Sequence, residues 1–208
     1  ITKVTVEEYL AGGKGLRSGS ILTEKGSLPS VTVKKSVIGG PGEKSAGIGL
    51  VTTVVGAVNV LGDISGFSGS ASANITGASI GSLTVGGSIN GGDGGGSGSV
   101  SSMGGIGPIA IGGSVIGGKG DWSGSVQASA PVPSVTITKA LAGGDGANSG
   151  SLLGPLGTVK ILGGMFGGNG DDSGKISGGQ VGDVTTSMLH GGFGQRSASV
   201  TSTGSLGT

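Results

Sequence analysis

The sequence predicts an all-β protein, a parallel β-helix (β-solenoid) built from eight turns of about 24 to 27 residues. Two observations lead to this prediction. One pattern of apolar residues, glycine and serine recurs eight times, and nearly all length differences between the repeats lie in one loop. Within each repeat, short stretches such as V-T-V and I-A-I alternate inward and outward residues, which is typical of β-strands.

The repeat covers the whole chain, so we expect a single solenoid domain. The predicted turns are 1–28, 29–55, 56–80, 81–106, 107–132, 133–156, 157–181 and 182–208. One turn holds too few apolar side chains to offset the ordering of its backbone. Stacked turns solve this problem, because parallel strands about 4.8 Å apart share hydrogen bonds and bury like residues against like.

About three short strands are expected in each turn, each marked by an apolar column. The first column is Val4, Val31, Val58, Leu83, Ile109, Val135, Val159 and Val184. A second column follows two residues later and is interrupted only by Thr186. The third column is Leu10, Val37, Ile64, Ile89, Val115, Leu141, Met165 and Leu189, and one residue is missing before Leu189. The fourth is Ile21, Ile48, Ile75, Val100, Val126, Leu152, Ile176 and Val200, and a fifth runs from Leu28 to Leu206.

A polar corner separates the third and fourth columns. A glycine recurs there at Gly12, Gly39, Gly66, Gly91, Gly117, Gly143, Gly167 and Gly191. A serine follows six residues later, at Ser18, Ser45, Ser72, Ser97, Ser123, Ser149, Ser173 and Ser197, and Gly or Ala always comes next. We interpret these serines as structural, because a turn serine can hydrogen-bond nearby backbone and stacked hydroxyls can bond one another as a ladder. A nucleophile would need a base, and the only histidine, His190, fits a surface variation better.

One corner, G-G-N-G-D-D at 167–172, fits the glycine-aspartate pattern of calcium-binding β-rolls. Those rolls repeat every nine residues or so, because ligands from successive turns close around the ion, whereas this unit returns after about 25. Asp121, Asp145, Asp171 and Asp172 are therefore weak calcium candidates, and solvated turns of variable sequence are the alternative. No other cofactor is expected, since the G-x-G-x-x-S-G run lacks the following helix that a dinucleotide loop needs.

The composition argues against several function classes. The net charge is +1 and aromatic residues are 2% of the chain, so nucleic-acid binding has neither its charge nor its stacking surface. No apolar stretch approaches the roughly 18 residues of a transmembrane helix. Enzyme activity is not expected, because a polysaccharide-active site needs paired carboxylates and acids are few. Ice binding is a remote alternative: threonine holds five of the eight outward positions of the first strand, without a second aligned column.

Rows such as GSLTVGGSINGGDGGGSGSV and GPIAIGGSVIGGKGDWSGSV resemble the glycine-rich β-strand-repeat arrays of very large bacterial surface proteins. These are autotransporter- or adhesin-like proteins of planctomycete and verrucomicrobial type. The resemblance covers the whole chain and implies an extracellular or cell-surface rod, sheath or filament, with no catalytic residues to carry over.

The predicted function is accordingly structural. The alternative is an adhesin stalk, or binding module, whose variable loop contacts a carbohydrate or another surface. Because Ile1 and Leu206 occupy the same column, we also expect either a segment of a longer array or a subunit that associates with its copies, end to end or laterally.

Overall fold

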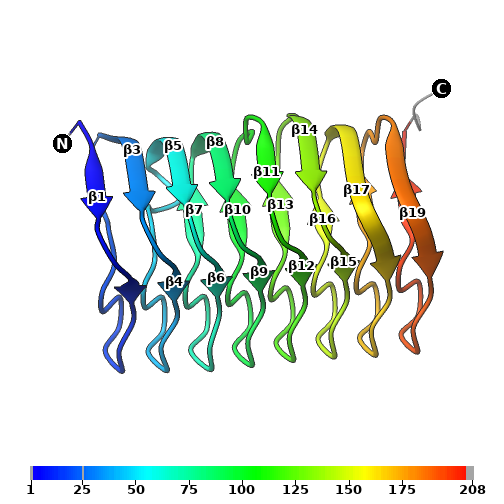
Figure 1. Ribbon diagram of the computed structural model, residues 1–208, viewed down its shortest axis with the longest axis horizontal. Helices are drawn as coiled ribbons and strands as arrows, with labels where there is room; N and C mark the ends of the chain where they lie inside the picture. Colours follow the sequence, from blue (N-terminus) through cyan, green and yellow to red (C-terminus); the bar gives the residue numbers. More distant parts are fainter. Residues whose placement is uncertain (1, 25, 205–208) are drawn as a thin grey trace.

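The computed structural model describes residues 2–24 and 26–204 and confirms the predicted parallel β-solenoid of about eight turns. The described residues contain strands and no α-helix. Figure 1 shows the turns stacked side by side, with the two ends of the chain at opposite ends of the stack. Ile1 and Leu206, which the sequence places in one column, lie outside the described residues.

Three ladders of strands run along the stack. The first ladder consists of β1 (Val4–Val6), β3 (Ser27–Val33), β5 (Val54–Val60), β8 (Ser79–Val85), β11 (Ile109–Ile111), β14 (Val132–Ile137), β17 (Leu156–Phe166) and β19 (Val184–His190). The second consists of β2 (Leu10–Ala11), β4 (Val37–Ile38), β6 (Ile64–Ser65), β9 (Ile89–Asn90), β12 (Val115–Ile116) and β15 (Leu141–Ala142), and it joins the first through β17. The third consists of β7 (Ile75–Gly77), β10 (Val100–Ser102), β13 (Val126–Ala128), β16 (Leu152–Leu153), β18 (Ile176–Gly178) and β20 (Val200–Ser202).

The register pairs each apolar column with itself. Val31 of β3 pairs with Val4 on one side and Val58 on the other, and all the ladders are parallel. In the third ladder, single bridges from Ile21 to Ile48 and from Ile48 to Ile75 continue the column into the first two turns. The repeat period read from the sequence is therefore the hydrogen-bonding period of the fold.

The core is a narrow stack of small apolar side chains. Its buried members are alanine, valine, leucine, isoleucine and methionine. Interior column residues such as Ile89 and Val115 are fully buried, because turns on both sides cover them. In the last described turn, Leu189 belongs to the same column but is 55% exposed, since no described turn lies beyond it.

The residue missing before Leu189 has a visible effect on the strands. In the last two turns, the first and second ladders merge into the continuous strands β17 and β19. Their pairing shifts register between Ile161 and Gly164, so that Met165 still meets Leu189. The deletion is thus absorbed as a local irregularity, and the column stays aligned.

A polar ladder stabilises the bend between the first and second strands of successive turns. The Ser36 hydroxyl accepts from the Asp63 amide, and the Asp63 carboxylate accepts from the Ser88 amide. The Ser88 hydroxyl accepts from the Ser114 amide, and the Ser114 hydroxyl accepts from the Ala140 amide. At this bend, side chains satisfy the backbone of the next turn where the strands are interrupted.

Candidate functional site

The polar corner between the third and fourth columns recurs in every turn. Two backbone positions in each corner have a positive φ. The first is the residue before the serine, at Arg17, Lys44, Ala71, Gly96, Trp122, Asn148, Asp172 and Arg196. The second is the residue after it, at Gly19, Ala46, Ala73, Gly98, Gly124, Gly150, Gly174 and Ala198. At the second position a Cβ on Gly150 would stand 1.9 Å from the carbonyl oxygen of Ala142, so this turn requires glycine, whereas three other turns place Ala46, Ala73 and Ala198 there.

Each corner serine accepts a hydrogen bond from its own turn. The hydroxyl accepts from the backbone amide five residues earlier, as in Gly118 to Ser123 at 3.0 Å. The same bond occurs at Ser18, Ser45, Ser72, Ser97, Ser149, Ser173 and Ser197. Each of these hydroxyls therefore ties the two ends of its own corner together and bonds within its own turn.

The corner glycine is matched to the serine of the following turn. A Cβ on Gly12 would stand 2.5 Å from the Ser45 Oγ, and a Cβ on Gly117 would stand 2.5 Å from the Ser149 Oγ. Such distances leave no room for a side chain, so glycine here is dictated by the next turn. Gly191, in the last turn, is the exception in this column, because nothing lies within 4 Å of its Cβ position among the described residues.

Sequence reasoning missed a second invariant glycine in the corner. It recurs three residues before each serine, at Gly15, Gly42, Gly69, Gly94, Gly120, Gly146, Gly170 and Gly194. The Gly120 amide donates to the Gly92 carbonyl of the preceding turn, and a Cβ there would strike the backbone of that turn. The eightfold recurrence was a signal available from the sequence alone.

The four calcium candidates do not converge on one point. The Asp121 carboxylate accepts from the Ala147 amide at 2.8 Å, and the Asp171 carboxylate accepts from the Gln195 amide at 2.8 Å. The Asp145 carboxylate accepts from the Asn169 side chain at 2.7 Å. In the part of the chain that the structure describes, no group of three or more His, Cys, Asp or Glu side chains could hold a metal ion together.

Asp172 has a different environment from the other candidates. Its carboxylate lies between Arg196, at 2.5 and 2.8 Å, and Lys175, at 3.1 Å, and is 15% exposed. The hydrogen bond from Arg196 lowers the pKa of Asp172 to about 2, although burial of the carboxylate opposes this, and Lys175 adds to the lowering. Both carboxylate oxygens are thus engaged by cations of the protein itself.

His190 lies at the end of β19, where its side chain is exposed and its carbonyl accepts from the Gly167 amide. Ser197 lies in the same last turn and accepts from the Gly192 amide, so its hydroxyl is part of the corner bond described above. The structure thus places His190 at the surface of the last described turn.

A cavity of about 310 Å³ lies on the outer side of the third ladder, at the first four turns. Its charged lining residues are Arg17 and Lys44, and its polar ones include Thr76 and Ser101.

Among the described residues, the structure contains no helix that could cross a membrane. No family model, curated protein or solved structure matches this chain.

Proposed function

We propose that this protein is a structural element of an extracellular rod, in which β-solenoids extend by axial stacking of their end turns. The observation that carries the proposal is Gly191. Its seven counterparts are glycine because the serine of the next turn occupies the space of a side chain, yet no described residue lies within 4 Å of the Cβ position of Gly191. A turn carrying a corner serine would fit there without rearrangement.

The backbone groups at the two ends are complementary. Inside the stack, the amide of a corner glycine donates to a carbonyl of the following turn, as Gly143 donates to Phe166 at 2.8 Å. The amide of the residue after a corner serine donates to a carbonyl of the preceding turn, as Gly174 donates to Ser149 at 2.9 Å. Among the described residues, the amides of Gly191 and Gly19 make no such bond, and they face opposite ends of the solenoid.

A further turn, of a longer array or of a second copy of this chain, would supply the partners that each end turn lacks. With a second copy placed in register, its Ser18 lies over Gly191, and its Gly19 amide reaches the Ser197 carbonyl. Unpaired strand edges favour such addition, because β1 and β19 each have a partner on one side only within the described residues. The extracellular location is part of the same proposal and rests on the resemblance of the repeats to bacterial surface arrays.

Light scattering coupled to size-exclusion chromatography, with electron microscopy of the same samples, tests the proposal. We expect the 208-residue chain to form particles whose length grows with protein concentration. We expect Gly191→Val to stay monomeric with an unchanged melting temperature, because its side chain enters space that only the incoming serine needs. A wild-type chain that stays monomeric at high concentration, or a Gly191→Val chain that polymerises equally well, contradicts the proposal.

A binding module is the second candidate function, and the cavity at the first four turns favours it. The cavity lies at the variable segment between the fourth and fifth columns. Stacking and binding use different surfaces, so one chain can carry out both.

A further inference from the structure

The cavity exists because neighbouring turns differ in length. The segment joining the fourth and fifth columns covers residues 21–28 and 48–55 in the first two turns, but only 75–80 in the third. The cavity draws on both kinds of turn, with Gly49 from the longer segment of the second turn and Thr76 from the shorter segment of the third. Leu22, Leu50 and Val51 line the cavity on the side of these longer segments.

A buried threonine holds the longer segment of the second turn, which lines the cavity with Leu50 and Val51. Thr53 is 1% exposed, and its hydroxyl donates to the Thr23 carbonyl at 3.2 Å. The same hydroxyl accepts from the Leu50 amide at 3.3 Å, and the Thr53 amide donates to the Leu50 carbonyl at 2.8 Å. These bonds fix the segment, so the cavity is formed before any ligand arrives.

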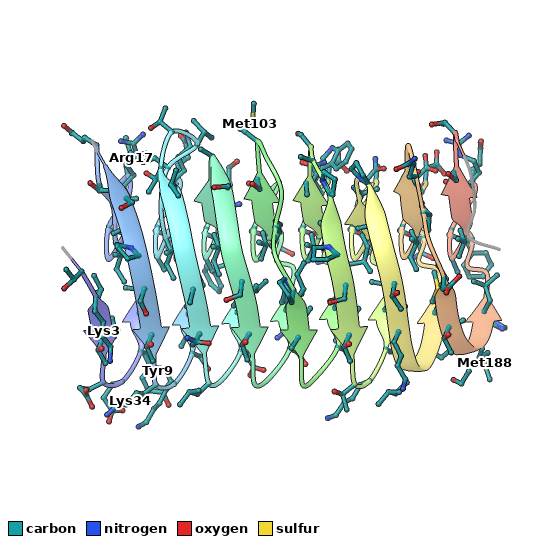
Figure 2. All side chains as sticks on the ribbon, turned by 90° about the horizontal axis from the view of Figure 1, so that it is seen from above. Lys3, Tyr9, Arg17, Lys34, Met103 and Met188 are labelled. Carbon is teal, nitrogen blue, oxygen red and sulfur yellow. The ribbon has the colours of Figure 1, made fainter. Side chains whose placement is uncertain are left out.

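The rim of the cavity carries more positive than negative charge. Arg17 and Lys44 occupy the same corner position in adjacent turns, and the Arg17 amide donates to the Glu43 carbonyl. Lys44 forms an ion pair with the Glu43 carboxylate at 2.9 Å, and this bond lowers the pKa of Glu43. Within the described residues, the Arg17 guanidinium makes no ion pair or hydrogen bond and is available to a ligand. Figure 2 shows Arg17 on the same long edge of the solenoid as Met103, opposite Tyr9 and Lys34.

The rest of the lining limits what the cavity can hold. Asn74, Thr76 and Ser101 line the cavity from the third and fourth turns and are hydrogen-bonded among themselves and to Ser99, while leucine, valine and alanine supply the apolar surface. A free phosphate would leave that apolar surface uncovered, and a hydrocarbon would leave the cations unpaired. A volume of about 310 Å³ is at the low end of small-molecule sites, which suits one compact ligand.

We propose that this cavity binds a small organic carboxylate, with the carboxylate on Arg17 and Lys44 and an apolar face against Leu22, Leu50 and Val51. A planar carboxylate matches the forked donors of arginine, which can bind it through two parallel hydrogen bonds. The chemistry is shared by a sugar acid and by a short-chain fatty acid. The site is independent of axial stacking and would stand if the end turns did not associate.

Titration followed by backbone amide NMR tests the site with two probes, D-glucuronate and hexanoate. A ligand of this size binds with a dissociation constant of about 1 mM when its fit is ordinary. We expect at least one probe to shift the amide signals of Gly47, Thr76 and Ser101 in a saturable way. A response to glucuronate alone assigns a sugar acid, and a response to hexanoate alone assigns a fatty acid. The neutral analogues glucose and hexanol should bind at least about tenfold more weakly.

Matched variants separate the cavity from a general charge effect. Arg17→Ala should weaken binding at least about fivefold and leave the fold intact, because Ala71 occupies the same corner position in the third turn. Lys14→Ala removes an exposed cation of the same turn that does not line the cavity, and should leave binding unchanged. Glu43→Gln should tighten binding by removing a competing carboxylate. The proposal is overturned if neither probe shifts these signals at 20-fold the expected dissociation constant, if the neutral analogues bind equally well, or if Lys14→Ala weakens binding as much as Arg17→Ala.

Discussion

Gly143 of the sixth turn faces Ser173 of the seventh so closely that a Cβ on the glycine would stand 2.5 Å from the serine Oγ. The backbone nitrogen of Gly168 lies 2.7 Å from the same point. Ser173 in turn accepts from that Gly168 nitrogen at 3.0 Å. One glycine therefore leaves the space in which the next turn closes its corner.

Gly143→Val should destabilise the solenoid by more than about 3 kcal/mol, because its side chain overlaps both a buried serine and backbone atoms that cannot move away. Chemical denaturation followed by circular dichroism measures the change. Gly191→Val introduces the same side chain at the equivalent position of the last turn and should change stability by less than about 0.5 kcal/mol. Equal losses in the two variants would contradict the matching of glycine to the next turn.

Ser123→Ala should cost about 1 to 3 kcal/mol, because it leaves the Gly118 amide without its acceptor inside a buried corner. Ser70→Ala is the control, since Ser70 is exposed and its hydroxyl only donates to the Gly95 carbonyl at 3.3 Å. We expect the control to stay within about 0.5 kcal/mol of the wild type. The comparison uses denaturation midpoints at neutral pH, and a smaller loss for Ser123→Ala than for Ser70→Ala would refute the role of the corner bond.

Asp172→Asn should lower stability near neutral pH and have little effect in strong acid. The Asp172 pKa is lowered from 3.8 to about 2 in the folded chain, mainly by Arg196. Its ionised form therefore stabilises the fold above pH 3.8, and this contribution is lost as the pH falls through about 2. Denaturation midpoints of both chains between pH 7 and pH 1.5 should converge at the acid end.

Asp93→Asn provides the control for that experiment, because Asp93 is an exposed aspartate at another corner and forms no ion pair within the described residues. The ion pairs of Asp172 would be unimportant if its variant matched the control at pH 7. A gap between Asp172→Asn and the wild type that stayed constant to pH 1.5 would exclude a contribution from its ionised form.

Ile89→Ala should cost about 2 to 5 kcal/mol, because the side chain is fully buried between turns and its removal leaves a cavity in a closely packed column. Ile116→Ala changes the same residue type on the outer face of the neighbouring strand, where the side chain is 39% exposed. A cost below about 1 kcal/mol is expected there. Urea denaturation of the two variants checks the difference, and similar midpoints would mean that the inward column had been misplaced.

The columns of apolar residues could be predicted from the sequence because each strand pairs with the same strand of the next turn. The period of the repeat therefore sets the register of the sheet. Val31 lies between Val4 and Val58 in the structure, as the period of the repeat requires. The position of a residue in the repeat is therefore enough to identify its pairing partner. The same logic located the corner glycines and serines, although not the partners of each hydroxyl.

The sequence could not predict details that depend on which groups come close together in space. A hydroxyl ladder and a bond within one turn both fit a column of serines, and only the geometry places the Gly118 amide on Ser123. The ladder through Asp63 and Ser88 was missed because the position changes residue type, from Ser36 to Asp63, Ser88, Ser114 and Ala140 in successive turns. The cavity was missed for a similar reason, since it forms from a difference in length between adjacent turns.

The backbone bonds between turns also determine how the solenoid would respond to force. Each turn is bonded to the turns before and after it, so tension applied to the two ends of the chain acts first on the outermost turns. Detaching one turn releases a segment as long as the spacing from Val4 to Val31, or about 90 Å of extended chain. A solenoid of this kind would therefore lengthen in nearly equal steps under load and rewind when the load falls.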